Sequence, residues 1–140
     1  MTQEERDLLL KDLCARLPYG VKVQYQVGSQ LPSIKRFNAR QYDELRNGSY
    51  IDDWLKCTFK PCLYPLSSMT EEQRKELEDM GWSFDNFEIN NINECLGTYR
   101  EYVSHSDCFT LIDWCNKNNF DYRGLIPMGL AIDCTNLSIY

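Results

Sequence analysis

The chain has 140 residues, of which 43% are hydrophobic and 26% charged, and its formal net charge is −6 at pH 7. This composition is typical of a globular domain and excludes a disordered or low-complexity chain, while the acidic excess disfavours binding to nucleic acid phosphates. No apolar run approaches the roughly 20 residues of a membrane span, and the charged N-terminus lacks the apolar stretch of a signal peptide. We therefore expect a cytoplasmic protein without membrane association.

The N-terminal segment has the pattern of a capped helix. Thr2 and Glu5 can form a capping box, in which each side chain bonds the backbone amide of the other residue. The apolar residues that follow with helical spacing are Leu10, Leu13, Cys14 and Leu17. Pro18 and Gly20 stop the pattern, which predicts a helix over residues 3–16.

Strict alternation follows over residues 21–27, with valine and tyrosine at every second position. This alternation predicts a strand that is buried on one side. A second strand is predicted over residues 34–37 and a short helix over residues 39–46. In residues 50–66, Pro61 and Pro65 predict a short element followed by an extended, packed loop instead of a long strand.

A second capping box, Thr70 with Gln73, predicts a helix over residues 71–79 that turns only Leu77 and Met80 inward. Two short alternating runs between residues 82 and 103 predict a pair of strands.

The C-terminal part predicts one more helix, capped by Ser106 and ended by Asn118 and Asn119. Its apolar face would hold Cys108, Leu111, Ile112 and Cys115, while Asp113, Asn116 and Lys117 face elsewhere. A turn through Gly124 and an edge strand over residues 130–132 would follow. The elements together predict an α+β fold in one domain, residues 1–140, with about three helices on a small, mainly antiparallel sheet.

Catalytic or metal-binding patterns are weak in this chain. The seven cysteines fit neither a disulfide framework nor the spacing of a zinc site, so we expect free thiols, most of them packed as small apolar residues, and no metal or cofactor. His105 lies three residues before Cys108, and Asp52 and Asp53 form an acidic pair, which leaves open a small enzyme or ligand-binding protein with a site at these residues.

Aromatic residues favour a different function. Nine tyrosines are present, and tyrosine is enriched where proteins bind partners. The tyrosines that we expect partly on the surface, as a binding patch, are Tyr99, Tyr102, Tyr122 and Tyr140. We therefore interpret the chain as a non-enzymatic protein whose partner is another protein. Nucleic-acid binding would require a basic strip at Lys35, Arg36 and Arg40 and is disfavoured by the net charge.

Three segments also carry a resemblance to a known family. PYGV at residues 18–21, FKPCLYPLSSMTEEQ at residues 59–73 and IDWCNKNNFDYRGLIPMGLAI at residues 112–132 resemble, in the same order, segments of short uncharacterised proteins from gut Bacteroides-type genomes, their phages and their mobile elements. The resemblance implies a cytoplasmic accessory protein of bacterial or phage origin, and it implies no catalytic residue.

Overall fold

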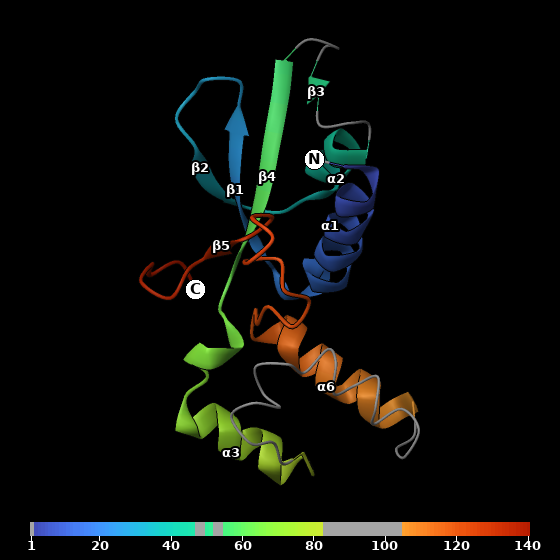
Figure 1. Ribbon diagram of the computed structural model, residues 1–140, viewed down its shortest axis with the longest axis vertical. Helices are drawn as coiled ribbons and strands as arrows, with labels where there is room; N and C mark the ends of the chain where they lie inside the picture. Colours follow the sequence, from blue (N-terminus) through green and yellow to red (C-terminus); the bar gives the residue numbers. More distant parts are fainter. Residues whose placement is uncertain (1, 47–49, 52–54, 83–104) are drawn as a thin grey trace.

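The computed structural model describes residues 2–46, 50–51, 55–82 and 105–140 (Figure 1). Within these residues the chain forms four α-helices and a mixed sheet, so the predicted α+β fold is confirmed. The α-helices are α1 (Gln3–Arg16), α2 (Ala39–Arg46), α3 (Glu71–Asp79) and α6 (His105–Lys117). The strands are β1 (Lys22–Val27), β2 (Ser33–Arg36), β3 (Tyr50–Ile51), β4 (Leu55–Leu63) and β5 (Ile132–Asp133), and two short 3-10 helices, η1 (Leu17–Tyr19) and η2 (Leu66–Ser68), follow α1 and β4.

The sheet has the strand order β2-β1-β4-β3, and all three of these pairings are antiparallel. β5 lies outside this order and pairs in parallel with the end of β4. Among the described strands β1 is the one neighbour of β2, so β2 lies at the edge of the described sheet. The strand predicted over residues 130–132 overlaps β5 at Ile132.

Both predicted capping boxes are present. At α1 the Thr2 hydroxyl accepts the Glu5 amide at 3.1 Å and the Glu5 carboxylate accepts the Thr2 amide at 2.8 Å. Thr70 and Gln73 do the same at α3, at 3.2 and 2.9 Å. Because a capping box satisfies backbone donors that a helix start leaves free, the sequence places the starts of α1 and α3 correctly.

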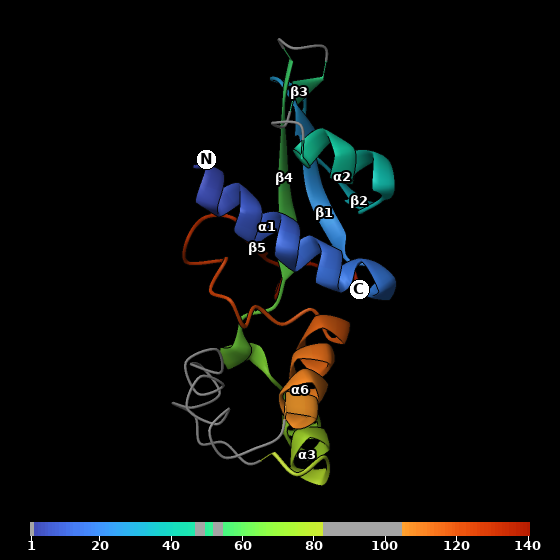
Figure 2. The ribbon, with the colours of Figure 1, turned by 90° about the vertical axis from the view of Figure 1, so that its right-hand side faces the viewer.

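One hydrophobic core lies between the sheet and α1. Leu9 and Leu13 of α1 pack with Val23 of β1 and Phe59 of β4, all of them buried. Figure 2 shows α1 and α2 on the same side of β1 and β4. The other face of these strands has no helix of the described residues packed on it.

The buried face of α1 differs from the predicted one. The buried residues are Leu9, Asp12, Leu13 and Arg16. Of the predicted stripe, Leu13 is buried and Leu10 half-buried, whereas Cys14 and Leu17 are exposed. The apolar spacing was misleading because Asp12 and Arg16 pair with each other, which allows two charged residues to share the face with the leucines.

The prediction that prolines break residues 50–66 was wrong for Pro61, which lies inside the nine-residue strand β4. Pro61 pairs with Val23, while on the other edge β3 pairs no further than Lys56 and β5 begins opposite Cys62. No described strand on that edge needs the N–H that proline lacks, so the ladder tolerates it. Pro65 does end the extended segment, directly before η2.

A second hydrophobic cluster lies at the other end of the molecule, between η2, α3 and α6. Its buried residues are Leu66, Leu77, Trp82, Leu111, Trp114, Cys115, Phe120 and Tyr122. Leu77 is buried as predicted, but Met80 is 37% exposed because it ends α3 beside the Gly81 turn and leaves the inward face.

Helix α6 confirms part of its predicted pattern. Leu111 and Cys115 are buried, and the left-handed conformations expected at Asn119 and Gly124 have φ of 60° and 76°. Two details were wrong. Ser106 lies inside the helix His105–Lys117 and is not its cap, and Asn116, which was expected to face away from the buried stripe, is 2% exposed.

The pair of strands predicted between residues 82 and 103 lies, apart from Trp82, outside the described residues. In the described part of the chain, no helix combines the length and the apolar character that crossing a membrane requires.

Candidate functional site

Most of the candidate site residues predicted from the sequence are outside the described residues or have undescribed side chains. Asp52, Asp53, Tyr99 and Tyr102 are outside the described residues. His105 and Cys108 belong to the start of α6, where only the backbone is described. A small enzyme or ligand-binding site at Asp52, Asp53, His105 and Cys108 therefore stays a prediction.

The two described tyrosines of the expected surface patch differ from each other. Tyr140 is 46% exposed, as expected, but the prediction for Tyr122 was wrong, because only 4% of this residue is exposed. Tyr122 packs in the second cluster, where the guanidinium groups of Arg16 and Arg123 lie over its ring. These two tyrosines do not form one surface patch.

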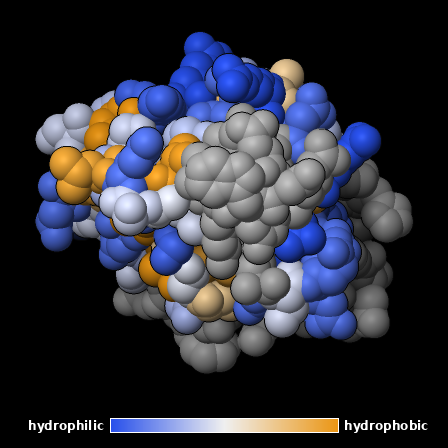
Figure 3. Space-filling model, turned by 90° about the horizontal axis from the view of Figure 1, so that it is seen from above, coloured by the Kyte–Doolittle hydropathy of each residue, from blue (hydrophilic) through white to orange (hydrophobic). Residues whose placement is uncertain are grey.

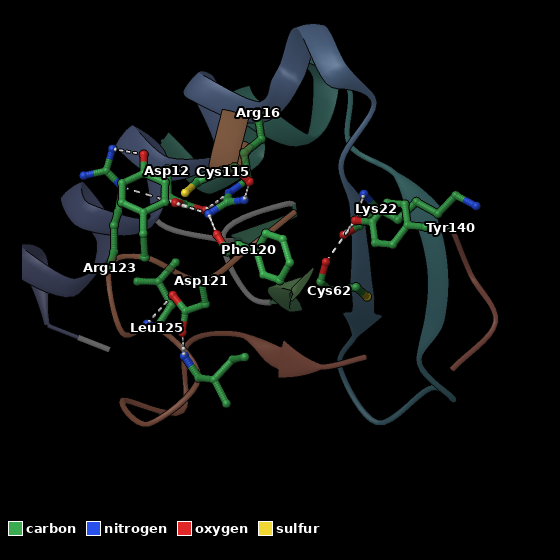
Figure 4. A network of polar contacts seen from close by, with 12 residues as sticks. Asp12, Arg16, Lys22, Cys62, Cys115, Phe120, Asp121, Arg123, Leu125 and Tyr140 are labelled. Carbon is green, nitrogen blue, oxygen red and sulfur yellow. Dashed lines mark hydrogen bonds and ion pairs between the residues drawn. The ribbon is translucent and has the colours of Figure 1, made fainter. Parts of the chain in front are cut away.

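A buried ionic network, which we call the Asp12 network, comprises Asp12, Arg16, Tyr122 and Arg123 (Figure 4). The Asp12 carboxylate accepts two bonds from Arg16, at 2.8 and 3.1 Å, and one from Arg123 at 3.2 Å. Asp12 and Arg16 are both fully buried. Bidentate bonding of this kind compensates the loss of water around both charges.

Arg16 also reaches the end of α6. Its guanidinium donates to the carbonyl oxygens of Phe120, at 2.7 Å, and of Cys115, at 3.5 Å. These carbonyls lie at the C-terminal end of the helix, where its dipole is negative and a cation is favoured. Arg16 thus ties α1 to the segment that joins the two hydrophobic clusters.

The ring of Tyr122 lies beside both arginines, with the guanidinium carbons of Arg16 and Arg123 5.5 and 4.8 Å from its centroid. Its hydroxyl accepts a bond from Arg123 at 2.9 Å. Burial raises the pKa of Tyr122 above its ordinary value, so the phenol stays neutral at physiological pH. The donors and acceptors of this network are used internally, so its geometry is that of a structural joint between elements.

The neighbouring Asp121 has a local structural role. Its two carboxylate oxygens accept the backbone amides of Leu125 and Ile126, each at 2.8 Å. These bonds hold the turn through Gly124 that returns Leu125 to the first core.

The C-terminal residue, Tyr140, completes the pairing of β1 with β4. The ladder ends at Val23 and Pro61, and the next residues in register are Lys22 and Cys62. Here the Tyr140 hydroxyl accepts the Lys22 amide at 2.9 Å and donates to the Cys62 carbonyl at 2.9 Å (Figure 4). The Lys22 ammonium donates to the Ile139 carbonyl, which holds the tail in the same place.

We expect Tyr140→Phe to destabilise the protein by about 1–2 kcal/mol, because it leaves a backbone donor and a backbone acceptor without their partner while water reaches the half-exposed tail. Urea unfolding followed by circular dichroism measures this difference. Tyr19→Phe, at an exposed tyrosine for which no hydroxyl hydrogen bond is found in the described residues, is the matched control and should change the free energy of unfolding by less than about 0.5 kcal/mol. Equal effects of the two substitutions would contradict the role given to the Tyr140 hydroxyl.

The described cysteines behave as apolar residues, with one exception. Cys62, Cys115 and Cys134 are buried and free, while Cys14 is free and exposed. Burial raises the pKa of Cys115 to about 12 and that of Cys134 to about 11, so both thiols remain protonated and unreactive near pH 7. Among the described residues, no group of three or more His, Cys, Asp or Glu side chains is placed to hold a metal ion.

We call the side of β2 that faces away from β1 the β2 edge, and no strand of the described residues pairs with it. All four residues of β2 are exposed. The Val21 carbonyl accepts the Phe37 amide and the Lys22 amide points toward β4, so the backbone groups of alternate β1 residues face β2. With the register Val23 to Lys35, this alternation turns the N–H and C=O groups of Ile34 and Arg36 outward.

Exposed apolar side chains accompany this edge. Leu31, in the turn before β2, is 92% exposed, and Ile34 is 40% exposed. Figure 3 shows hydrophobic surface on its left side, where β1, β2 and the C-terminal segment lie in Figure 1. An open edge with apolar residues beside it can accept an extended segment of another chain. The sequence indicated the strand itself, but only the pairing shows that it is an edge.

Comparison of the chain with models of protein families, with curated proteins and with solved structures gave no match. The fold and the geometry define an α+β protein with an open sheet edge and a buried ionic joint. The family resemblance of residues 18–21, 59–73 and 112–132 stays a prediction.

Proposed function

We propose that this protein is a non-enzymatic, protein-binding accessory factor that takes up an extended segment of its partner along the β2 edge. The observation that carries the proposal is the outward-facing backbone of Ile34 and Arg36 on a strand whose four residues are all exposed. A partner segment that pairs there would gain main-chain hydrogen bonds, and side-chain contacts at alternate residues would give specificity.

The exposed apolar residues support the same function. Leu31 and Ile34 have no role in either hydrophobic cluster, so their exposure is not a requirement of the fold. Burying them against a partner would contribute about 25 cal/mol per Å² of apolar surface removed from water. The resemblance to bacterial and phage accessory proteins favours a partner in the bacterial cell.

Ile34→Pro tests this function directly. Proline at this position removes an N–H that points away from β1, so the fold should persist, while a partner strand loses a bond and meets the proline ring. We expect the affinity for the partner to fall about tenfold, since one lost hydrogen bond costs about 0.5–1.5 kcal/mol. Ile34→Ala, which removes most of the side chain but keeps the N–H, should bind more tightly than Ile34→Pro.

The measurement uses the full chain with a photoreactive phenylalanine at Ser33, irradiated in extracts of the cells that make the protein. A discrete cross-linked partner whose yield is kept in Ile34→Ala and clearly reduced in Ile34→Pro supports binding along the edge. A probe at Lys117, exposed on α6, is the positional control. Equal cross-linking from both probes, or an equal yield in the two Ile34 variants, would overturn the proposal. Circular dichroism confirms that each variant is folded.

A further inference from the structure

Charge is distributed unevenly between the strands β1, β2 and β4 and the rest of the chain. Residues 17–42 and 55–70, which form β1, β2 and β4, contain six Lys and Arg residues, and all 21 acidic residues lie outside these two segments. In a protein with a net charge of −6, the charged residues of β1, β2 and β4 are therefore all basic, and the one acidic residue in a described strand is Asp133 of β5. The net charge alone favours a basic partner, whereas the basic strands favour an acidic one.

The side of the sheet that faces away from α1 presents part of this basic charge. Successive side chains of a strand point to opposite faces of the sheet. Because Val23 of β1 and Phe59 of β4 point to the core, their neighbours in each strand point to the other face. We call this side the open sheet face; its residues are Lys22, Gln24, Gln26, Ile34, Arg36, Thr58 and Lys60. Each of these residues is exposed or half-buried.

The basic residues of this face lie close together in register. Lys22 of β1 is directly opposite Arg36 of β2. Lys60 of β4 is directly opposite Gln24 of β1, which is the next residue after Lys22 on the same face of that strand. Like charges directly opposite each other on neighbouring strands destabilise a sheet. The two side chains turn apart, since the Lys22 ammonium bonds Ile139 and the Arg36 guanidinium lies over Gly20, within 3.3 Å of where a Cβ would stand.

Arg36 and Lys60 are the exposed cations of the open sheet face, and no described carboxylate neutralises them. A like-charged pair brings no gain in folding, so an external anion is the simplest source of compensation. The open sheet face is also continuous with the β2 edge, because Arg36 and Ile34 belong to both.

We propose that the open sheet face binds an acidic segment of the partner protein, so that carboxylates of the partner meet Lys22, Arg36 and Lys60 while its backbone pairs with β2. This inference rests on the proposed function and adds the chemistry of the partner. The amides of Gln24 and Gln26 add hydrogen-bonding groups between the cations.

The face fits a protein segment better than a nucleic acid. Proteins that bind single strands stack bases on aromatic side chains, whereas none of the seven residues of the open sheet face is aromatic, and the ring of Tyr140 beside this face is taken up by the Lys22 ammonium. The acidic remainder of the molecule would also repel a long polyphosphate. A short acidic peptide would contact only the basic residues of this face and would not extend over the acidic remainder of the molecule.

The experiment uses the isotopically labelled full chain and nuclear magnetic resonance, with synthetic peptides of alternating sequence as probes: Glu-Val, Gln-Val and Lys-Val repeats of equal length, and an oligothymidylate. We expect the Glu-Val peptide to bind most tightly, with shifts concentrated in β1, β2 and β4, and its affinity to fall as salt is added. The double variant Arg36→Gln with Lys60→Gln should weaken its binding about three- to tenfold.

Lys75→Gln with Lys117→Gln removes the same charge from exposed positions of α3 and α6 and is the matched control, expected to leave the affinity unchanged. Gln-Val binding as tightly as Glu-Val along β2 would overturn the acidic preference while the edge-binding function stands. Tighter binding of the oligothymidylate at the same residues would replace the protein segment with a nucleic acid. No shift in β2 with any peptide would count against both proposals.

Discussion

Replacing Asp12 with alanine is expected to destabilise the protein by about 3–5 kcal/mol, the cost of leaving a buried charge without its counterion. Arg16 is fully buried and donates both of its charge-assisted side-chain bonds to the Asp12 carboxylate. Arg123 also loses a partner, but its side chain is 15% exposed and can turn to water. Since the free energy of unfolding of a native protein is about 5–15 kcal/mol, we expect the variant to be only marginally stable.

Thermal unfolding followed by circular dichroism measures this effect, and the midpoint should fall by on the order of 10 °C. Asp7→Ala removes an exposed acid from the same helix and is expected to change stability by less than about 0.5 kcal/mol. The double variant Asp12→Ala with Arg16→Met should lose less than the sum of the single losses, because no unpaired cation remains in the interior. Strict additivity would contradict a direct ionic coupling.

Phe120→Ala is expected to cost about 3–5 kcal/mol, the range for removing a large aromatic residue from a core. Phe120 is 1% exposed, stacks on Trp114 with ring centroids 5.5 Å apart and lies 6.3 Å from the ring of Tyr64. Its backbone forms an isolated β-bridge with Tyr64, the residue after β4, and its carbonyl accepts a bond from Arg16. The substitution therefore removes the centre of the contact between α6 and the end of β4.

Urea unfolding, monitored by circular dichroism and by tryptophan fluorescence, measures the loss. Phe120→Leu keeps most of the apolar volume and should cost distinctly less, while Met128→Ala, at a position that is 47% exposed, should cost less than about 0.5 kcal/mol. A loss below about 1.5 kcal/mol for Phe120→Ala would show that the second cluster does not depend on this ring.

Local elements of this fold were predictable because short-range interactions specify them. The capping boxes at Thr2 and Thr70 place α1 and α3 to the residue, and strict alternation places β1 within one residue. The failure at Pro61 has a clear cause. Whether proline breaks a strand depends on the neighbour that its missing N–H would have met, and that neighbour comes from another part of the chain.

The candidate sites were less predictable than the elements. Asp12 and Arg16 have the spacing of a helical ion pair, which on a surface helix contributes little. Only the position of Phe120, 104 residues away, shows that this pair is buried and functions as a joint. Tyr122 was expected on the surface for its residue type, and it is buried because Arg16 and Arg123 provide partners for its ring and hydroxyl.

The sequence by itself determined the α+β class, the starts of two helices, one complete strand and the left-handed turn residues, because each depends on residues a few positions apart. The tertiary structure decided which charges are buried, which strand is the edge and which face of the sheet is open. These properties depend on contacts between residues distant in the chain, such as the Tyr140 hydroxyl with the backbone of Lys22, 118 positions away. Burial and pairing are collective results of packing, and no local pattern specifies them.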